Sequence, residues 1–144
     1  MGAPRVIIVD DDEAVRDSLK LLLECCGLAV EDYGSIDEFA LQYRPGGASC
    51  IILDQHLPGL TGLNFLSSDA GAKLGLPVIV LTGHADSALR ARAAQLGVRV
   101  LLEKPVIEDV LLDAIRRALG DQAATIAETA ATGALEENCA TSTN

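Results

Sequence analysis

The sequence predicts an α/β protein built on a doubly wound, five-stranded parallel sheet. Five short apolar segments of strand length alternate with segments in which apolar residues recur at helical spacing. Parallel strands joined by helices need right-handed crossovers, so that helices cover both faces of the sheet. Four of the apolar segments lead into acidic, basic or hydroxyl-bearing residues, and parallel strands would bring those residues together at one edge.

The first two strands flank the first helix. Residues 6–9 are a run of Val and Ile that ends at three aspartates, residues 10–12. Apolar residues then recur at helical spacing over residues 15–26, and Gly27 supplies the stop. Residues 29–33 form a weaker strand that carries charges, which is typical of the edge of a sheet.

The second helix and the third strand occupy the next part of the chain. Ser35 and Glu38 have the form of a capping box, which predicts a short helix that runs through Tyr43. The Pro-Gly-Gly sequence of residues 45–47 breaks this helix. Residues 51–54, three apolar residues and an aspartate, are too few for an ordinary helix and suit a strand that is buried on both faces.

A third helix and a fourth strand follow. The helical pattern begins at Leu60, after a loop that contains Pro and Gly. Residues 67–75 are polar and contain Gly, which predicts an irregular connection. Residues 78–81 form another buried strand, which ends in Thr-Gly-His at residues 82–84.

The last part of the chain contains two helices, one strand and a tail. An Ala-rich helix over residues 86–96 is followed by a strand over residues 98–102 and by Glu-Lys-Pro. The closing helix ends at Gly120, and its apolar positions are Val110, Leu111, Ala114, Ile115 and Ala118. Periodicity fails from residue 121 onward. We therefore expect one domain over residues 1–120 and a flexible acidic tail or linker, without Lys or Arg, over residues 121–144.

Composition and charge exclude several classes of function. A chain of 144 residues that is 49% hydrophobic, with two Phe, two Tyr and no Trp, predicts one domain with an aliphatic core. The formal net charge of −10 argues against direct binding to nucleic acid or to an anionic membrane surface. No apolar run reaches membrane-spanning length and no leader opens the chain, so we expect a soluble, cytoplasmic protein.

The cysteines fit neither a metal site nor a secreted disulfide framework; they are Cys25, Cys26, Cys50 and Cys139. We interpret them as small buried hydrophobic residues. Because Cys25 and Cys26 are adjacent on a helix, at most one of them faces inward.

The residues that follow four of the strands form one chemical set: Asp10, Asp11, Asp54, Thr82 and Lys104. The acids would repel one another, because two charges about 4 Å apart cost on the order of 4 kcal/mol at an effective dielectric of about 20. A hard cation such as Mg²⁺ would offset this repulsion, since it prefers oxygen ligands. With a lysine and a hydroxyl group nearby, the set suits the transfer of a phosphoryl group to a carboxylate.

These residues resemble the receiver domain of two-component response regulators over about residues 4–120. The resemblance rests on the order, spacing and strand-end placement of four motifs: Val9-Asp10-Asp11, Asp54 with Pro58 and Gly62, Thr82-Gly83, and Lys104-Pro105. Other details look most like receivers joined to LuxR-type helix-turn-helix output domains: Val15-Arg16, Thr82-Gly83-His84 and Glu103-Lys104-Pro105. The resemblance implies a flavodoxin-like fold with strand order 2-1-3-4-5. We expect either a stand-alone receiver or a piece of a longer protein, with the output domain separate or missing.

The resemblance also implies a role for each acid. Asp54 resembles the phosphoacceptor, which attacks the phosphohistidine of a partner sensor histidine kinase. Asp11 resembles a direct ligand of Mg²⁺ (or Mn²⁺), and Asp10 a ligand that acts through water. Asp54 itself and the backbone carbonyl of His56 complete the implied metal site.

The remaining implied roles concern the switch and the lifetime of the phosphoryl group. Thr82 resembles the switch hydroxyl, and Lys104 resembles the lysine that pairs with the phosphoryl group. The peptide bond between Lys104 and Pro105 is typically cis in the family. The positions of His56, Gly83 and His84 are ones that modulate the phosphorylated state. The two histidines alone would fit either solvent-facing loop residues or metal ligands, and we favour the first. The family usually carries Tyr or Phe where this chain has Leu101. In typical receivers that aromatic ring rotates inward when the hydroxyl at the Thr82 position moves toward the phosphoryl group. Leu101 therefore predicts an altered conformational switch.

Asp12 leaves the register of the acid pair open between Asp10-Asp11 and Asp11-Asp12. The end of the strand and the spacing to Arg16 favour the first. Asp12 then becomes the N-cap of the first helix.

Three functions compete for this sequence. The first is a self-phosphorylating signalling receiver with weak autophosphatase activity, which is not a dedicated enzyme; its partners are a sensor histidine kinase and, on phosphorylation, a second copy of the chain. The second is a metal-dependent phosphohydrolase, but that class carries its nucleophile after the first strand. The third is a pseudo-receiver that binds a partner without phosphorylation, but such proteins usually lose an acid or the lysine. We favour the first.

Overall fold

A five-stranded parallel sheet forms the centre of the protein, in a computed structural model that describes residues 4–47 and 49–127. The strand order is β2-β1-β3-β4-β5, and each neighbouring pair is parallel, which confirms the predicted fold class and strand order. Strand β2 lies at one edge, as its charges predicted. The strands are β1 (Arg5–Val9), β2 (Ala29–Tyr33), β3 (Ser49–Asp54), β4 (Val78–Thr82) and β5 (Val100–Glu103).

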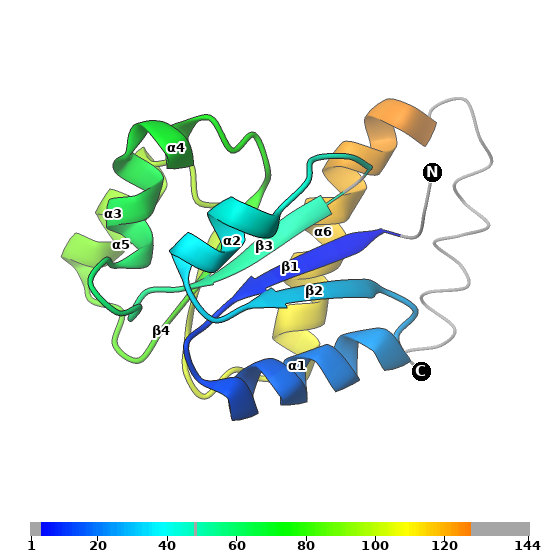
Figure 1. The fold of residues 1–144 in the computed structure, drawn as a ribbon, viewed down its shortest axis with the longest axis horizontal. Coiled ribbons are helices and arrows are strands. Elements are labelled where there is room, and N and C mark those ends of the chain that lie inside the picture. The colour runs from blue at the N-terminus through cyan, green and yellow to red at the C-terminus, as the bar shows by residue number, and fades with distance from the viewer. Residues whose placement is uncertain (1–3, 48, 128–144) are drawn as a thin grey trace.

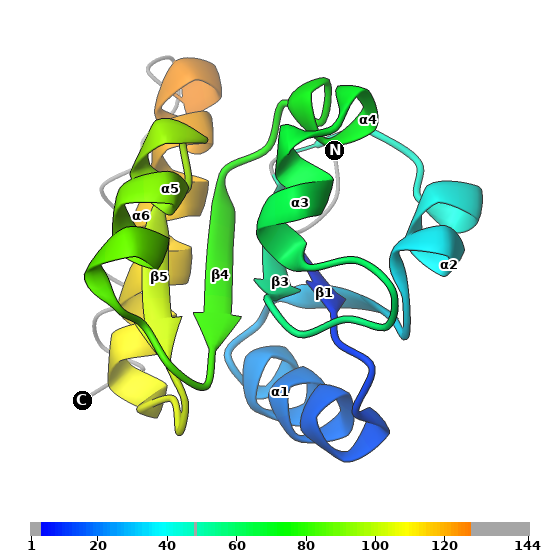
Figure 2. The same ribbon diagram turned by 90° about the vertical axis from the view of Figure 1, so that its left-hand side faces the viewer.

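Helices cover both faces of the sheet (Figures 1 and 2). They are α1 (Glu13–Cys25), α2 (Ile36–Gln42), α3 (Gly62–Ser67), α4 (Asp69–Ala72), α5 (Ser87–Gln95) and α6 (Glu108–Ala127). Apolar residues of α1 and α6 pack on one face, and those of α2, α3 and α5 pack on the other. The sheet therefore separates two apolar cores.

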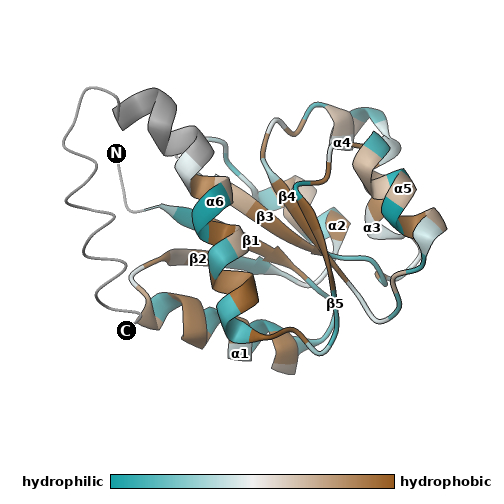
Figure 3. Cartoon of the chain, turned by 180° about the vertical axis from the view of Figure 1, so that it is seen from behind, coloured by the Kyte–Doolittle hydropathy of each residue, from teal (hydrophilic) through white to brown (hydrophobic). Residues whose placement is uncertain are grey.

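The alternation of side chains along β1 explains why that strand is apolar throughout. Val6 and Ile8 belong to the core under α1 and α6, whereas Ile7 and Val9 belong to the core under α2, α3 and α5. All four side chains have no exposed surface. The strands are accordingly among the most hydrophobic parts of the ribbon (Figure 3), as expected for a parallel sheet that is buried on both faces.

Two side chains cap helices where the sequence predicted caps. Asp12 accepts hydrogen bonds from the backbone N–H groups of Ala14 and Val15, which confirms it as the N-cap of α1. Ser35 caps α2 by accepting from the N–H of Glu38. The Glu38 carboxylate accepts from the N–H of Gly34 rather than from that of the cap residue, so the predicted capping box is closed one residue further out.

Helix α4 and the start of β5 differ from the sequence-based expectation. Residues 69–72 form a short helix inside the connection predicted to be irregular, because the Ser68 hydroxyl group caps it by accepting from the N–H of Gly71. Strand β5 begins at Val100 rather than at residue 98. The N–H of Val98 is instead bound to the carbonyl of Ala93 at the end of α5.

Helix α6 also extends beyond its predicted end. It passes through Gly120 and ends at Ala127, so the expected stop at Gly120 is wrong. A glycine inside a helix is tolerated at a cost of roughly 1 kcal/mol relative to alanine, and residues 121–127 contain several good helix formers. Residues 128–144 of the expected tail lie outside the described residues, and the flexibility of the tail and the domain boundary at 120 stay predictions.

The cysteines divide into exposed and buried positions. Cys25 and Cys26 are both exposed, so their predicted role as buried hydrophobic residues is wrong. The inward side of α1 is filled by leucines, and Cys26 is already the C-cap residue. Cys50 is buried as expected, and burial raises the pKa of its thiol to about 12. Cys139 lies outside the described residues.

No helix of residues 4–47 and 49–127 combines the length and the apolar character needed to cross a membrane.

Candidate functional site at the carboxyl edge of the sheet

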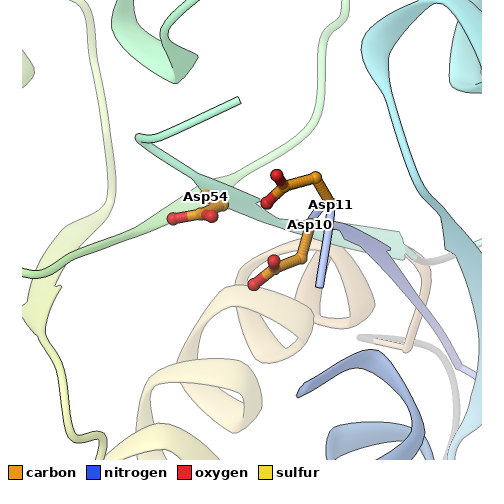
Figure 4. A group of neighbouring side chains, drawn as sticks. All are labelled: Asp10, Asp11 and Asp54. Atoms are coloured by element: carbon orange, nitrogen blue, oxygen red, sulfur yellow. The ribbon is translucent and has the colours of Figure 1, made fainter. Parts of the chain in front are cut away.

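Three carboxylates meet at the carboxyl edge of the sheet (Figure 4). Ligand atoms of Asp10, Asp11 and Asp54 lie within 4.8 Å of one another. The pairing of β1 with β3 places Val9 beside Leu53, so Asp10 and Asp54 follow as neighbours at the ends of adjacent strands. Asp10 and Asp54 are only 2% and 3% exposed, whereas Asp11 is exposed. The structure thus brings Asp10 and Asp11, rather than Asp12, together with Asp54; their role as metal ligands stays a prediction.

Lys104 supplies a cation to this cluster. Its Nζ atom lies 3.2 Å from Oδ1 of Asp54 and 3.7 Å from Oδ2 of Asp10. The loop after β5 carries the lysine, and the Lys104 N–H donates to the carbonyl of Thr82 at the end of β4. The peptide bond between Lys104 and Pro105 is cis, as the sequence predicted.

The carboxyl group of Asp10 is poorly stabilised as an anion. Desolvation by burial is the main cause that raises the pKa of Asp10, and the charge of Asp54 raises it further. The N–H of Asp12, which donates to Oδ1 at 2.9 Å, and the charge of Lys104 act in the opposite direction. Oδ2 is buried without a hydrogen-bond partner among the described residues. A buried oxygen without a donor, facing two other carboxylates, fits a hard divalent cation.

Thr82 and the two histidines border the cluster. The Thr82 side chain is buried; its hydroxyl group donates to the carbonyl of His84 at 3.1 Å and accepts from the N–H of His84 at 3.3 Å. The N–H of His56 donates to Oδ1 of Asp54 at 3.3 Å. Both histidine side chains are exposed, as is Gly83. The group of potential metal ligands found in the described part of the chain contains neither histidine, which fits the solvent-facing interpretation.

A comparison with protein families decides which family the chain belongs to. Residues 6–116 match the model of the response regulator receiver domain. The chain belongs to the receiver family. The family likeness stated from the sequence is therefore confirmed, and members of this family act in signal transduction by accepting phosphoryl groups.

Relatives and solved structures agree with this assignment. The chain is 40% identical over 118 residues to the transcriptional regulatory protein FixJ of Azorhizobium caulinodans, an alignment that covers 82% of this chain and 56% of FixJ. The structure of the response regulator StyR matches with a TM-score of 0.77 and 32% identity, covering 94% of this chain and 69% of StyR. A CheY-like receiver domain from Methanospirillum hungatei matches with a TM-score of 0.74 and 29% identity, covering 84% and 97% of the two chains. This receiver spans about half the length of the curated relatives that it matches.

Gly62 and Gln55 pack closely at the carboxyl end of β3, next to Asp54. A Cβ atom on Gly62 would lie 2.8 Å from the carbonyl oxygen of Asp54, so this position accepts only glycine without a shift of the backbone. Gln55 is buried, and its side-chain oxygen accepts from the N–H of Leu63 at 2.9 Å. The sequence singled out Gly62 through its motif but missed Gln55, because a polar residue after an aspartate reads as an ordinary loop residue.

A shallow groove of about 430 Å³ adjoins the receiver's acid cluster. Its far side is formed by α5, where Nη2 of Arg92 donates to the side-chain oxygen of Asn64 on α3 at 2.6 Å. The groove is lined by Gln55, His56, Thr82, His84, Asp86, Ala88, Leu89 and Arg92. No sequence pattern predicts this groove, because its lining comes from two segments, residues 55–56 and 82–92, that are distant in the chain.

Leu101 lies away from these charges in the receiver. It is half-buried on β5, beside Val80 of β4, and packs against the core under α2, α3 and α5. Its altered role in the switch stays a prediction.

Proposed function

We propose that this receiver accepts a phosphoryl group on Asp54, with Mg²⁺ or Mn²⁺ held by Asp10, Asp11, Asp54 and the backbone carbonyl of His56. The observation that carries the proposal is the buried cluster in which Lys104 Nζ lies 3.2 Å from Asp54. A pseudo-receiver that has lost its chemistry would not need this arrangement. A bound cation would supply charge compensation for the three carboxylates and for the incoming phosphoryl oxygens.

The acceptor carboxylate offers one oxygen for attack. The Nζ of Lys104 and the N–H of His56 both contact Oδ1 of Asp54. This leaves Oδ2, which we assign as the atom that forms the new O–P bond while the bond from phosphorus to the nitrogen of the donor histidine breaks. The freed electron pair stays on the donor imidazole, and Lys104 is placed to pair with the negative oxygens of the transferred group. Thr82 would reach those oxygens by breaking the two hydrogen bonds between its hydroxyl group and the backbone of His84.

We also propose which partners act with this receiver and where in the cell it acts. The phosphodonor is a sensor histidine kinase, as for receivers of this family. Relatives of the chain carry output domains, and we propose that phosphorylation controls such an output, with homodimer formation as one route. We place the receiver in the cytoplasm, and we assign to it self-phosphorylation and slow loss of the phosphoryl group rather than the turnover of a separate substrate.

Intact-mass spectrometry after incubation with a small phosphodonor tests the acceptor. We expect a gain of about 80 Da in the wild type, only in the presence of Mg²⁺, and no gain in Asp54→Asn. Asp12→Asn is the matched control, because it changes a nearby acid and keeps a residue that can cap α1. An adduct on Asp54→Asn, or none on the wild type with Mg²⁺, would contradict the proposal.

A further inference from the structure

Arg16 of α1 holds the backbone of the acidic turn. Its Nη1 atom donates to the carbonyl oxygen of Asp10 at 2.7 Å. That carbonyl belongs to the peptide unit that links Asp10 to Asp11. A peptide unit is planar, so fixing its oxygen also fixes the directions in which the chain leaves at both ends. One hydrogen bond thus influences the placement of both carboxylates.

The guanidinium group of Arg16 is itself fixed by strand β2. Its Nε atom lies 3.0 Å from Oδ2 of Asp32, and the side chain is 15% exposed. Space for it is provided by Gly34, where a Cβ atom would lie 3.3 Å from Nη1. Arg16 thereby connects the ends of β1 and β2 through two donors of one rigid group.

The other contacts of Asp10 are complementary to this one. Its N–H donates to the carbonyl of Tyr33 at 3.1 Å, and its Oδ1 accepts from the N–H of Asp12 at 2.9 Å. With the backbone and Oδ1 held in this way, Oδ2 is left facing the cluster. Asp32 balances the charge of Arg16. We therefore expect Arg16 to act on the position of the Asp10 and Asp11 carboxylates rather than on the net charge of the cluster.

We propose that Arg16 is a positioning residue that sets the metal affinity of the acid pair through the Asp10 carbonyl. This inference rests on the proposed function, since it concerns the cation assigned to Asp10 and Asp11. Partners that orient metal ligands typically change metal affinity by 10–100-fold when they are removed. We expect the lower end of that range, because the backbone of Asp10 keeps its other contact.

Lys20 provides a matched control on the same helix. It lies one turn after Arg16 and pairs with the same carboxylate, Nζ to Oδ1 of Asp32 at 3.9 Å. Lys20→Gln and Arg16→Gln therefore each remove one positive charge from α1, and each takes an ion-pair partner away from Asp32. Of the two side chains, Arg16 has the bond to the Asp10 carbonyl.

The experiment measures Mg²⁺ affinity by titration of the unphosphorylated full chain, followed by amide chemical shifts and by the rise in Tm. We expect Arg16→Gln and Arg16→Lys to raise the Kd for Mg²⁺ about tenfold, and Lys20→Gln to change it by less than about twofold. Saturating Mg²⁺ should return the phosphorylation rate of the Arg16 variants close to that of the wild type. Because Mg²⁺ also stabilises the folded state, the Tm of each variant is measured first without metal, which separates a loss of stability from a loss of metal affinity.

The outcomes separate this inference from the function on which it rests. A Kd that rises equally in Arg16→Gln and Lys20→Gln, or in neither, overturns the positioning role. If Arg16→Gln fails to fold, Arg16→Lys decides, because lysine keeps the charge without the two-pronged geometry. A wild type whose Mg²⁺ response is the same as that of Asp11→Asn would instead refute the proposed metal site.

Discussion

At the scale of single residues, Asp10 makes the metal-free protein sensitive to pH. Burial raises the pKa of its carboxyl group above the ordinary value of 3.8. The folded protein therefore keeps the Asp10 proton at pH values where the unfolded chain has already lost it. The free energy of unfolding then falls as the pH rises from about 4 through the raised pKa, and the loss is complete above it.

Asp10→Asn should remove this loss. In EDTA, we expect the variant to be more stable than the wild type at pH 7, by about 1.4 kcal/mol for each unit by which the pKa is raised, and the gain to vanish below pH 4. Urea denaturation at several pH values measures it. With saturating Mg²⁺ the order should reverse, because the variant has lost a ligand. A gain that is the same at every pH would show that the charge of Asp10 is not its cause.

Two glycines that look alike in the sequence should respond oppositely to alanine. A Cβ atom on Gly71 would clash with the carbonyl oxygen of Phe65, whereas one on Gly120 meets nothing within 4 Å. We expect Gly71→Ala to destabilise the fold by about 1–3 kcal/mol through overpacking. Gly120→Ala should stabilise α6 by up to about 1 kcal/mol. Thermal melting of the two variants is the measurement, and a stable Gly71→Ala would contradict the close approach.

Single residues were predictable from the sequence where a local motif defines them. The cap role of Asp12 and the cluster of Asp10, Asp11 and Asp54 follow from strand ends and cap chemistry, which are local patterns. The contacts of Arg16 and Gln55 were not predictable, because each depends on how far one element lies from another. The exposure of Cys25 and Cys26 was missed for the same reason.

At the scale of elements, α5 is only lightly anchored to the face of the sheet that α2, α3 and α5 cover. Ala93 is its buried residue, and Leu89 is half-buried. A hydrogen bond from Arg92 to Asn64 links it to α3. By contrast, α6 places six residues in the opposite core. Since Thr82 and His84 lead directly into α5, we expect a change at the site to reach this helix first.

The switch should therefore appear in α5 rather than at Leu101. We expect a beryllofluoride mimic of the phosphoryl group to shift the amide signals of residues 83–86 and of α5 most, because a leucine has no ring to swing inward. Leu101→Ala should reduce stability by about 2 kcal/mol, the lower end for a leucine that is only half-buried, while phosphorylation persists. Largest shifts at Leu101, with a new rotamer of its side chain, would contradict this mechanism.

Element type was predictable, but several boundaries were not. The apolar runs defined all five strands, since a parallel sheet covered on both faces requires them. The start of β5 depends on the N–H of Val98, which donates to the carbonyl of Ala93 in α5 instead of joining the sheet. Helix α4 depends on a single hydrogen bond, in which the Ser68 hydroxyl group accepts from the N–H of Gly71. The sequence does not predict the end of α6, because Gly120 has the pattern of a helix stop although seven helical residues follow it.

At the scale of the whole molecule, the net charge of −10 limits the partners of the isolated chain. Neutralising DNA phosphates requires clustered basic residues, so we expect no measurable binding to duplex DNA. Fluorescence anisotropy with a labelled duplex, at low and at physiological salt, checks this. Phosphorylated and unphosphorylated chains should behave alike. Tight binding that weakens steeply with salt would contradict it.

The position of β1 within the sheet also bears on how the protein forms during synthesis. The first strand of this sheet to be synthesised lies between β2 and β3, and its Arg5 pairs with Ser49, 44 residues later. Until β3 emerges, a nascent chain can complete only the β1-α1-β2 unit, with one side of β1 unpaired. Pairings between distant segments slow folding, because the loop between them must be closed first. The acid cluster therefore assembles only after this late step, and a chain interrupted before Ser49 can form neither the pairing of β1 with β3 nor the acid cluster.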